Sequence, residues 1–349
     1  MNTIKCFCLE WSFTGNMTYG RAAHTASILS NGKILVIGGE GIDNIALNSA
    51  ELYDLSTSTW IATSKMNNAR YLHTASVLSN GKILVIGGQG INNIILNIAE
   101  LYDPSTGTWT TTGNMNNARY AHTASVLSNG KVLVTGGHGN GYLSSAELYD
   151  PSTGTWTTTS NMNNVRSVHT ASVLSNGKIL VTGGNNGNGS LNSAELYDLS
   201  TSTWTTTGNM SNARRWHTAS VLSNGKVLVT GGMGSRNIIL NSAELYDPPT
   251  STWTTTSNMN NVRRWHAASV LSNGKVLVTG GSRSGDALNS AELYDPSTST
   301  WTTTGNMNSI RYGHTASVLS NGKILVTGGY DYNNIALNSA ELYELFGTN

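Results

Sequence analysis

The stretch that decides the fold is residues 119–156, which read RYAHTASVLSNGKVLVTGGHGNGYLSSAELYDPSTGTW. Nearly the same text occurs seven times in the 349 residues, each copy marked by a pair of glycines. These pairs lie at positions 38–39, 87–88, 136–137, 183–184, 231–232, 280–281 and 328–329. Their spacings are 49, 49, 47, 48, 49 and 48 residues. Such a period is typical of proteins that stack one supersecondary unit on the next, so we predict a single domain over residues 1–349.

Each copy predicts four short strands separated by turn residues. In the third copy these strands cover residues 123–127, 131–135, 146–149 and 153–159. Asn129-Gly130 predicts a two-residue hairpin in which both residues take positive φ. Asp-Pro-Ser-Thr at 150–153 supplies the second tight turn. A four-stranded unit repeated about every 48 residues predicts an all-β fold, namely a seven-bladed β-propeller of four-stranded antiparallel blades.

A Tyr followed by a Trp after six intervening residues is the second constant feature. It occurs at Tyr53/Trp60, Tyr102/Trp109, Tyr149/Trp156, Tyr197/Trp204, Tyr246/Trp253 and Tyr294/Trp301. With the double glycine and an Arg-x-x-His element before the hairpin, this spacing makes the sequence resemble the kelch repeat, of the type also found in galactose oxidase-like propellers. The resemblance spans roughly residues 9–344 and implies one kelch-type propeller domain.

The two ends of the chain predict how the ring closes. The seventh copy stops after residues 340–344 without its Trp, whereas Trp11 lies ten residues before Arg21, the offset found in the other copies. We therefore expect residues 7–13 to form the outer strand of the last blade, which removes an exposed sheet edge. The alternative, that the chain belongs to a longer array, stays open at this point.

Composition excludes several classes of function. Lys plus Arg number 20 against 19 Asp plus Glu, a balance without the basic excess of a nucleic-acid binder. No apolar run approaches the 18 or so residues of a membrane helix, so we expect no membrane partner. We also expect the protein to be a monomer. The only cysteines, Cys6 and Cys8, cannot complete a structural zinc site alone. Residues 1–10 lack the pattern of a signal peptide, which favours a cytoplasmic location and leaves an extracellular one open.

Variation in length and chemistry between the copies gathers in two segments. The loop after the glycine pair has 10, 10, 8, 9, 10, 9 and 10 residues, and the two residues between the motif Arg and His differ from copy to copy. In an up-and-down blade both segments emerge on the same face, and variable loops on one face are where repeat proteins usually bind. Drift after duplication is the alternative explanation.

Charges outside the repeat motif gather on this variable rim. The motif Arg and Glu are expected to pair within the scaffold, because buried charges need partners. Copies five and six carry a basic and aromatic set, Arg215, Trp216, Arg236, Arg264, Trp265 and Arg283. The seventh copy adds Tyr330, Asp331 and Tyr332, next to Glu40 and Asp43 of the first. His138, the one His outside the motif, is a further candidate rim contact.

Trp, Tyr and Arg often dominate binding energy, so these residues predict a site for an acidic or phosphorylated extended peptide. In the alternative interpretation, Trp216 and Trp265 fill the channel mouth as larger versions of Ala121 and Val168.

Catalysis is not expected. Seven of the eight His occupy one repeat position and are expected to hydrogen-bond the backbone near the axis: His24, His73, His122, His169, His217, His266 and His314. Galactose oxidase-like enzymes use a Cys crosslinked to a Tyr together with copper-binding His and Tyr, and no Cys lies within these repeats. We therefore expect no catalytic residues, metal or cofactor. The sequence favours a noncatalytic module that recognises a protein or peptide. The alternatives are a glycan-binding or vestigial galactose oxidase-like propeller, and an enzyme with an unrecognised site.

Overall fold

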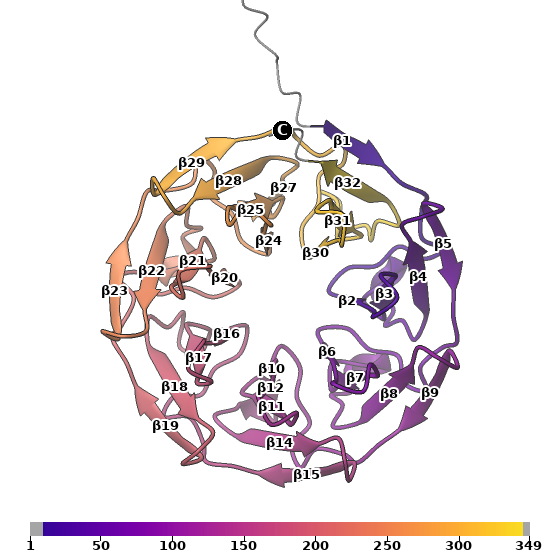
Figure 1. The fold of residues 1–349 in the computed structure, drawn as a ribbon, viewed down its shortest axis with the longest axis horizontal. Helices are drawn as coiled ribbons and strands as arrows, with labels where there is room; N and C mark the ends of the chain where they lie inside the picture. The colour runs from indigo at the N-terminus through magenta and orange to yellow at the C-terminus, as the bar shows by residue number, and fades with distance from the viewer. Residues whose placement is uncertain (1–9, 345–349) are drawn as a thin grey trace, which may run out of the picture.

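The computed structural model describes residues 10–344, which form a ring of seven four-stranded antiparallel sheets (Figure 1). Blade 1 consists of β2 (Thr25–Ile28), β3 (Ile34–Ile37), β4 (Ala50–Asp54) and β5 (Thr59–Ala62). Blade 2 consists of β6 (Thr74–Val77), β7 (Ile83–Ile86), β8 (Ala99–Asp103) and β9 (Thr108–Thr111). Blade 3 consists of β10 (Thr123–Val126), β11 (Val132–Thr135), β14 (Ala146–Asp150) and β15 (Thr155–Thr158).

Blade 4 consists of β16 (Thr170–Val173), β17 (Ile179–Thr182), β18 (Ala194–Asp198) and β19 (Thr203–Thr206). Blade 5 consists of β20 (Thr218–Val221), β21 (Val227–Thr230), β22 (Ala243–Asp247) and β23 (Thr252–Thr255). Blade 6 consists of β24 (Ala267–Val270), β25 (Val276–Thr279), β28 (Ala291–Asp295) and β29 (Thr300–Thr303). Blade 7 consists of β30 (Thr315–Val318), β31 (Ile324–Thr327), β32 (Ala340–Glu344) and β1 (Glu10–Phe13).

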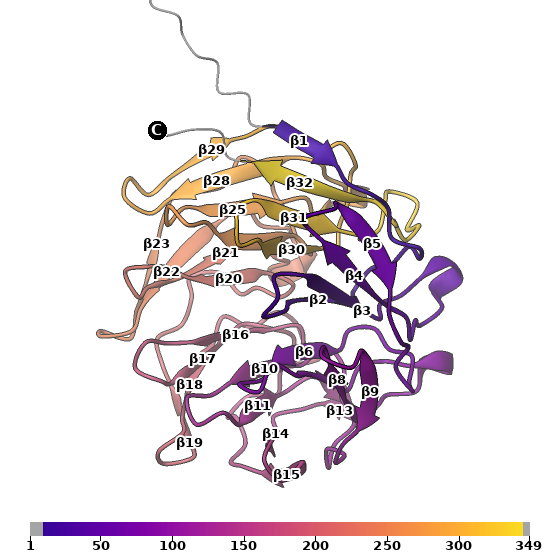
Figure 2. The ribbon, with the colours of Figure 1, turned by 45° about the vertical axis from the view of Figure 1, so that its right-hand side comes forward.

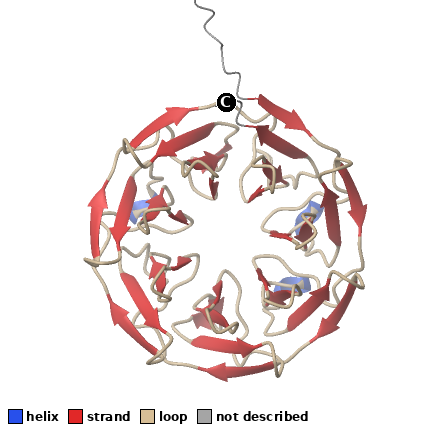
Figure 3. Cartoon of the chain, in the orientation of Figure 1, coloured by secondary structure: helices blue, strands red, loops and turns tan. Residues whose placement is uncertain are grey.

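The loops of the rim carry the remaining elements. These are the two-residue strands β12 (His138–Gly139), β13 (Gly141–Tyr142), β26 (Ser282–Arg283) and β27 (Asp286–Ala287), and the single-turn 3-10 helices η1 (Ile42–Asn44), η2 (Ile91–Asn93) and η3 (Ser235–Asn237), blue in Figure 3. The first strand of each blade lies nearest the central channel and the fourth forms the perimeter (Figure 1). The predicted seven-bladed, four-stranded architecture is confirmed.

The ring closes between the two ends of the chain, as the sequence predicts. Strand β1 pairs antiparallel with β32, with Trp11 opposite Tyr343, and the two strands lie side by side in Figures 1 and 2. Of the expected strand 7–13, residues 10–13 are in place, and 7–9 lie outside the described residues. Closure pairs the outer edge of β32, which would otherwise expose a row of amide and carbonyl groups.

Apolar side chains fill the space between blades. The second strand of every blade is fully buried, as in Val132–Thr135. Leu84 of blade 2 packs in one cluster with Val134 and Tyr149 of blade 3, and the same arrangement recurs around the ring. Each blade therefore buries its apolar surface against its neighbours, which is why a single repeat cannot form a stable core.

The Asn-Gly turns differ from the prediction in one respect. Gly130 has φ +81°, but Asn129 is not among the positive-φ residues of the described chain. The Gly130 amide donates to the Leu127 carbonyl (2.9 Å), and the Leu127 amide donates to the Lys131 carbonyl (2.8 Å). The prediction of a two-residue turn was therefore wrong. The loop has three residues, a type I turn followed by a left-handed glycine, which requires positive φ only at the glycine.

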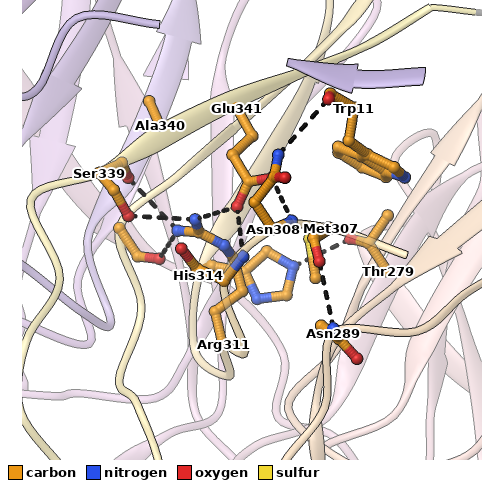
Figure 4. A network of polar contacts seen from close by, with 12 residues as sticks. Trp11, Thr279, Asn289, Met307, Asn308, Arg311, His314, Ser339, Ala340 and Glu341 are labelled. Carbon is orange, nitrogen blue, oxygen red and sulfur yellow. Dashed lines mark hydrogen bonds and ion pairs between the residues drawn. The ribbon is translucent and has the colours of Figure 1, made fainter. Parts of the chain in front are cut away.

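The motif Arg and Glu form buried ion pairs, as predicted. In blade 7, Arg311 Nη2 lies 2.8 Å from Glu341 Oε1, and both side chains are fully buried (Figure 4). Glu341 also accepts hydrogen bonds from the amides of Asn308 (2.6 Å) and Ser309 (2.9 Å). Because the carboxylate is satisfied by a cation and two amides, its burial is tolerated. The same pair occurs in all seven blades.

The first glycine of each pair is explained by contact between adjacent blades. A Cβ on Gly136 would lie 2.4 Å from the Arg166 carbonyl oxygen and 2.8 Å from Cε1 of His169, both in blade 4. Gly136 also has φ +60°. The motif Arg and His of one blade thus pack directly on the first glycine of the preceding blade, where a side chain does not fit. The second glycine, Gly137, has no room for a Cβ beside Tyr120 and His122 of its own blade.

The motif His join neighbouring blades through threonine hydroxyls. His169 Nε2 lies 2.9 Å from Thr123 Oγ1 and 3.3 Å from Thr135 Oγ1, both in the preceding blade. These bonds to threonine side chains of the preceding blade are contacts that the sequence did not predict. Burial lowers the pKa of these imidazoles, to about 3 for His73, so they are neutral near pH 7.

Candidate functional site

The two variable segments of each blade lie together on one rim. In blade 5 the Arg215 amide donates to the Met233 carbonyl (3.0 Å), and the Met233 amide donates to the Arg215 carbonyl (2.7 Å). Equivalent backbone bridges link Ala22 to Glu40 and Tyr120 to His138. The expectation that the loop after the glycines and the Arg-x-x-His element share a face is confirmed.

A closed circle of backbone hydrogen bonds surrounds the channel mouth on this rim. Each residue just before a motif His donates its amide to the equivalent carbonyl of the preceding blade, at 2.9 to 3.1 Å. The seven residues, all at φ between +49° and +64°, are Ala23, Leu72, Ala121, Val168, Trp216, Trp265 and Gly313. Left-handed φ is unusual for a β-branched residue such as Val168, so only Gly313 signals this conformation in the sequence.

Four aromatic side chains from three blades form a continuous row, which we call the aromatic arc. The ring centroids of Trp216 and Trp265 are 5.5 Å apart, and those of Trp265 and Tyr312 are 5.8 Å apart. Tyr312 continues to Tyr330 at 5.2 Å. These separations fall in the range of favourable aromatic pairs, so the rings hold one another in place.

The aromatic arc borders a pocket of about 440 Å³, the rim pocket. Its lining residues are Asn44, Trp216, Arg264, Trp265, Ser282, Gly285, Tyr312, Tyr330 and Asn334. Aromatic walls with a few polar groups are the usual composition of a binding pocket. The pocket therefore brings together four residues that the sequence singled out: Trp216, Arg264, Trp265 and Tyr330.

Two arginines stack on Trp216 beside the rim pocket. The guanidinium carbons of Arg215 and Arg264 lie 4.9 and 5.2 Å from its ring centroid. Arg215 also donates to Asn237 Oδ1 (2.8 Å). Apart from this stacking, the Arg264 guanidinium has a single hydrogen-bond partner within residues 10–344, the sulfur of Met233 (3.7 Å), and it forms no ion pair there. Burial and then the charge of Arg215 lower the pKa of Arg264, so an anion placed here would relieve an uncompensated positive charge.

The other predicted residues lie outside this pocket. Arg236 and Arg283 are exposed on their loops, as is Tyr332. The Asp331 carboxylate accepts hydrogen bonds from the amides of Asn333 (2.8 Å) and Ile335 (2.9 Å), so it shapes its own loop. His138 belongs to blade 3, where its ring packs between those of Tyr120 (5.4 Å) and Tyr142 (4.8 Å).

Five lining residues were missed from the sequence. Tyr312 occupies the repeat position of Arg215 and Arg264, a signal that could have identified it. The other four, Asn44, Ser282, Gly285 and Asn334, come from loops of three blades whose approach depends on the ring.

The alternative interpretation of the two Trp also has structural support. Trp216 and Trp265 line a cavity of about 220 Å³ at the channel mouth, together with Ala23, Leu72 and Gly313. They occupy the same position in the backbone circle as Ala121 and Val168. Each indole therefore separates the rim pocket from the channel and packs on both sides.

Within residues 10–344, no three His, Cys, Asp or Glu side chains lie close enough together to hold a metal. The motif imidazoles instead meet threonine hydroxyls, as at Thr123. Cys6 and Cys8 lie outside the described part of the chain. The helical segments found between residues 10 and 344 are too short to span a membrane.

Comparison with solved structures shows likeness of fold. A novel fungal alcohol oxidase with catalytic diversity among the AA5 family, in complex with copper, superposes with a TM-score of 0.79 at 20% identity, over 97% of this chain and 76% of the oxidase. YjhT superposes with a TM-score of 0.65 at 17% identity, over 84% of this chain and 99% of its own. At these identities the likeness carries only the fold. No curated protein sequence matches at a significant level.

Family models identify the repeats. The model of the KLHDC2/KLHL20/DRC7 Kelch-repeats domain matches residues 2–184 and 73–281. The model of the Kelch motif matches residues 263–308. Together with the double glycines, the Tyr–Trp pairs and the seven-bladed ring, these matches show that the chain belongs to the kelch-repeat family.

Proposed function

We propose that the protein is a noncatalytic binding module whose rim pocket recognises an acidic or phosphorylated segment of a partner protein. The observation that carries the proposal is Arg264, a guanidinium without an ion pair among the described residues, held against Trp216 at the wall of the pocket. Kelch propellers generally mediate interactions between proteins, which supports a protein as the partner.

The chemistry of the pocket favours an anion with an extended backbone. A guanidinium has five donors in a fixed plane and binds carboxylate or phosphate oxygens in pairs. Stacking on Trp216 holds that plane, and the neighbouring ring of Trp265 reduces access of water, which strengthens a charge-assisted hydrogen bond. Ser282, Asn44 and Asn334 add hydroxyl and amide groups that can bond a peptide backbone.

A glycan is the second candidate ligand, favoured by one observation. Aromatic rings beside the side-chain amides of Asn44 and Asn334 can serve a sugar ring and its hydroxyls as well as a peptide. The two candidates differ in their need for charge, because only the acidic or phosphorylated peptide depends on the cation of Arg264.

The test is selection from a displayed library of random 12-residue peptides, with a phosphopeptide array and a glycan array in parallel. Arg264→Ser and Trp265→Leu introduce the residues that other blades carry at Ser167 and Leu72. We expect enrichment of acidic or phosphorylated peptides, whose affinity falls by roughly 1–4 kcal/mol in each variant. Arg283→Ser, which removes an exposed arginine outside the pocket, is the matched control and should bind like the wild type.

Two outcomes oppose the proposal. Wild-type affinity of both pocket variants would exclude the rim pocket as the peptide site. Enrichment of uncharged glycans, with Trp265 required and Arg264 dispensable, would replace the peptide by the glycan.

A further inference from the structure

Blades 7, 1 and 2 expose large apolar side chains on neighbouring rim loops. Six residues are between 49% and 62% exposed and form what we call the isoleucine arc: Ile335, Tyr332, Ile42, Ile45, Ile91 and Ile94. The rim loops of blades 3, 4 and 6 expose no large apolar side chain in the described chain. A contiguous apolar surface of this kind is a mark of an interaction site.

The isoleucines are held in place by tight backbone turns. In blade 1 the Gly41 amide donates to the Ile45 carbonyl (2.8 Å), and the Ile45 amide donates to the Ile42 carbonyl (3.4 Å). Asp43 and Asn44 between them take left-handed φ of +60° and +58°. Blade 2 repeats this hydrogen-bonded turn between Gly90 and Ile94. Two of the three loops that form the isoleucine arc, those of blades 1 and 2, therefore hold their isoleucines by the same turn.

Between these two loops lies a second pocket of about 320 Å³, which we call the acidic pocket. Ile45 of blade 1 and Ile91 of the adjacent blade 2 line it, and Glu40 and Asp43 supply two carboxylates. The rim loops of blades 7, 1 and 2, residues 330–339, 40–49 and 89–98, contain no Lys or Arg. The pocket therefore has a negative charge that nothing on its own loops neutralises.

Two tyrosines flank Glu40. The Tyr330 hydroxyl donates a hydrogen bond to the Glu40 carboxylate. Tyr71, which lines the acidic pocket, has its pKa raised to about 12 by burial and then by the charge of Glu40. The negative charge of Glu40 therefore acts on the ring of Tyr71 inside the pocket. Carboxylates next to aromatic rings are the surroundings that an organic cation prefers.

We propose that the acidic pocket binds the Lys or Arg side chain of a partner segment whose apolar side chains cover the isoleucine arc. The partner is identified by complementarity, because an apolar surface complements the apolar loops and a cation complements the two carboxylates. Asn44 lines both the acidic pocket and the rim pocket, so the two sites are adjacent. The inference goes beyond the proposed function, since it concerns different residues and the opposite charge.

The test uses the same random 12-residue peptide library, two variants built from the chain's own repeats and one control variant. Glu40→Gln with Asp43→Asn introduces the residues that blade 2 carries at Gln89 and Asn92. Ile91→Ser introduces the residue that blade 5 carries at Ser235. Arg283→Ser again serves as the control. Because Gln89, Asn92 and Ser235 already occur at equivalent positions, the two pocket variants should fold, and Arg283 is exposed. Circular dichroism and comparison of melting temperatures verify this.

The wild type is expected to enrich peptides with Lys or Arg beside aliphatic residues. One such peptide, labelled with fluorescein, should bind at least about tenfold more weakly to the Glu40→Gln/Asp43→Asn protein, as a lost charge-assisted hydrogen bond implies. Replacing its Lys by norleucine should weaken binding to the wild type and have little effect on binding to that variant. Ile91→Ser should weaken both peptides alike.

Three results would overturn the inference. These are an absence of basic, aliphatic peptides from the selection, equal affinity of wild type and double variant, and wild-type dimers in sedimentation that Ile91→Ser dissociates, which would make a second copy the occupant. Enrichment of acidic peptides reports on the rim pocket and enrichment of basic peptides on the acidic pocket, so either proposal can fail alone.

Discussion

The indole of Trp11 packs against the phenol ring of Tyr343, with the ring centroids 5.0 Å apart, although the two residues lie at opposite ends of the chain. Trp11 Nε1 also donates to the Gly305 carbonyl (2.8 Å). In blade 3, where all strands are consecutive in sequence, Trp156 lies 5.1 Å from Tyr149. The closing blade therefore reproduces the packing of a continuous blade by noncovalent contact alone.

Trp11→Ala is expected to lower the free energy of unfolding by about 2 kcal/mol, the sum of a lost aromatic pair and a lost hydrogen bond. Trp11 is half-buried, so the loss is smaller than for a core aromatic. Chemical denaturation checks the value, and Trp156→Ala, which removes the equivalent contacts in blade 3, is the matched control. If deletion of residues 1–13 leaves the melting temperature unchanged, the closure does not stabilise the ring.

Two glycines of blade 4 separate backbone strain from steric conflict. Gly177 has φ +79° and open space around it, so Gly177→Ala should cost about 1–2 kcal/mol of stability. A Cβ on Gly183 would meet the Arg214 carbonyl oxygen at 2.4 Å and His217 Cε1 at 2.8 Å. Gly183→Ala should therefore cost roughly 1–3 kcal/mol more. Equal losses in urea titrations of the two variants would contradict the packing of one blade on the next.

Stability should fall as the pH drops below 6.5. Burial, and then nearby arginine charges, lower the pKa of the motif His, to about 3 for His314. Between about pH 6.5 and 3 the unfolded chain binds protons at these His and the folded chain does not, so the free energy of unfolding rises with pH in this window. Denaturant titrations between pH 7 and pH 5 measure the slope.

Substitution of a single motif His should remove its contribution to the pH dependence of the free energy of unfolding. The pKa of His217 lies well below its ordinary value for the same reason. His217→Gln should reduce the slope by about 1.4 kcal/mol per pH unit below pH 6, the contribution of one proton. An unfolding free energy that is flat from pH 7 to pH 5 in the wild type would show that the imidazoles are not buried neutral.

Arg264→Ala should change stability by less than about 0.5 kcal/mol, because within the described residues its guanidinium forms no ion pair and meets only the sulfur of Met233 and the half-exposed ring of Trp216. Trp265→Ala should cost about 1 kcal/mol, because its ring pairs with those of Trp216 and Tyr312. Thermal melts and peptide affinities of the same variants together distinguish a binding role of these residues from a packing role at the channel mouth. A large loss of stability in Arg264→Ala that precedes any loss of binding would favour a packing role.

We also expect purified protein to retain no stoichiometric copper or zinc after dialysis against a chelator, and to have no oxidase activity. The reason is that the motif His face threonines such as Thr123 and Thr135 and form no cluster of ligands in the described chain. Elemental analysis checks this. A metal that survives dialysis at one equivalent would contradict the expected absence of a metal site.

Comparison of the copies within one chain made much of the scaffold predictable. A position that is identical in all seven copies, such as the Arg and Glu of each ion pair, must serve the repeat, and Arg311 and Glu341 meet as expected. The unmatched Trp11 likewise predicted the closing strand. The Asn-Gly turn was less well predicted, because the residue pair alone does not distinguish a two-residue loop from a three-residue loop with one left-handed glycine.

The candidate site was predicted only in part. Arg264 and Trp265 stand out because they depart from the repeat, and the rim pocket contains both. Nothing in the sequence indicated that Arg283, from the same blade, would lie outside it. Of the acidic pocket, the sequence predicted the carboxylates of Glu40 and Asp43 but not the apolar walls, since Ile45 and Ile91 look like ordinary strand residues until the turns expose them.

The sequence by itself determined the repeat, the strands and the closure of the ring, because these depend on local patterns and on contacts repeated in every blade. Only the tertiary structure decided which rim residues meet. Asn44 and Asn334 belong to the first and last blades, and they line one pocket because seven blades complete the circle and bring those blades together. Contacts of this kind occur once and not seven times, so no internal comparison of repeats can reveal them.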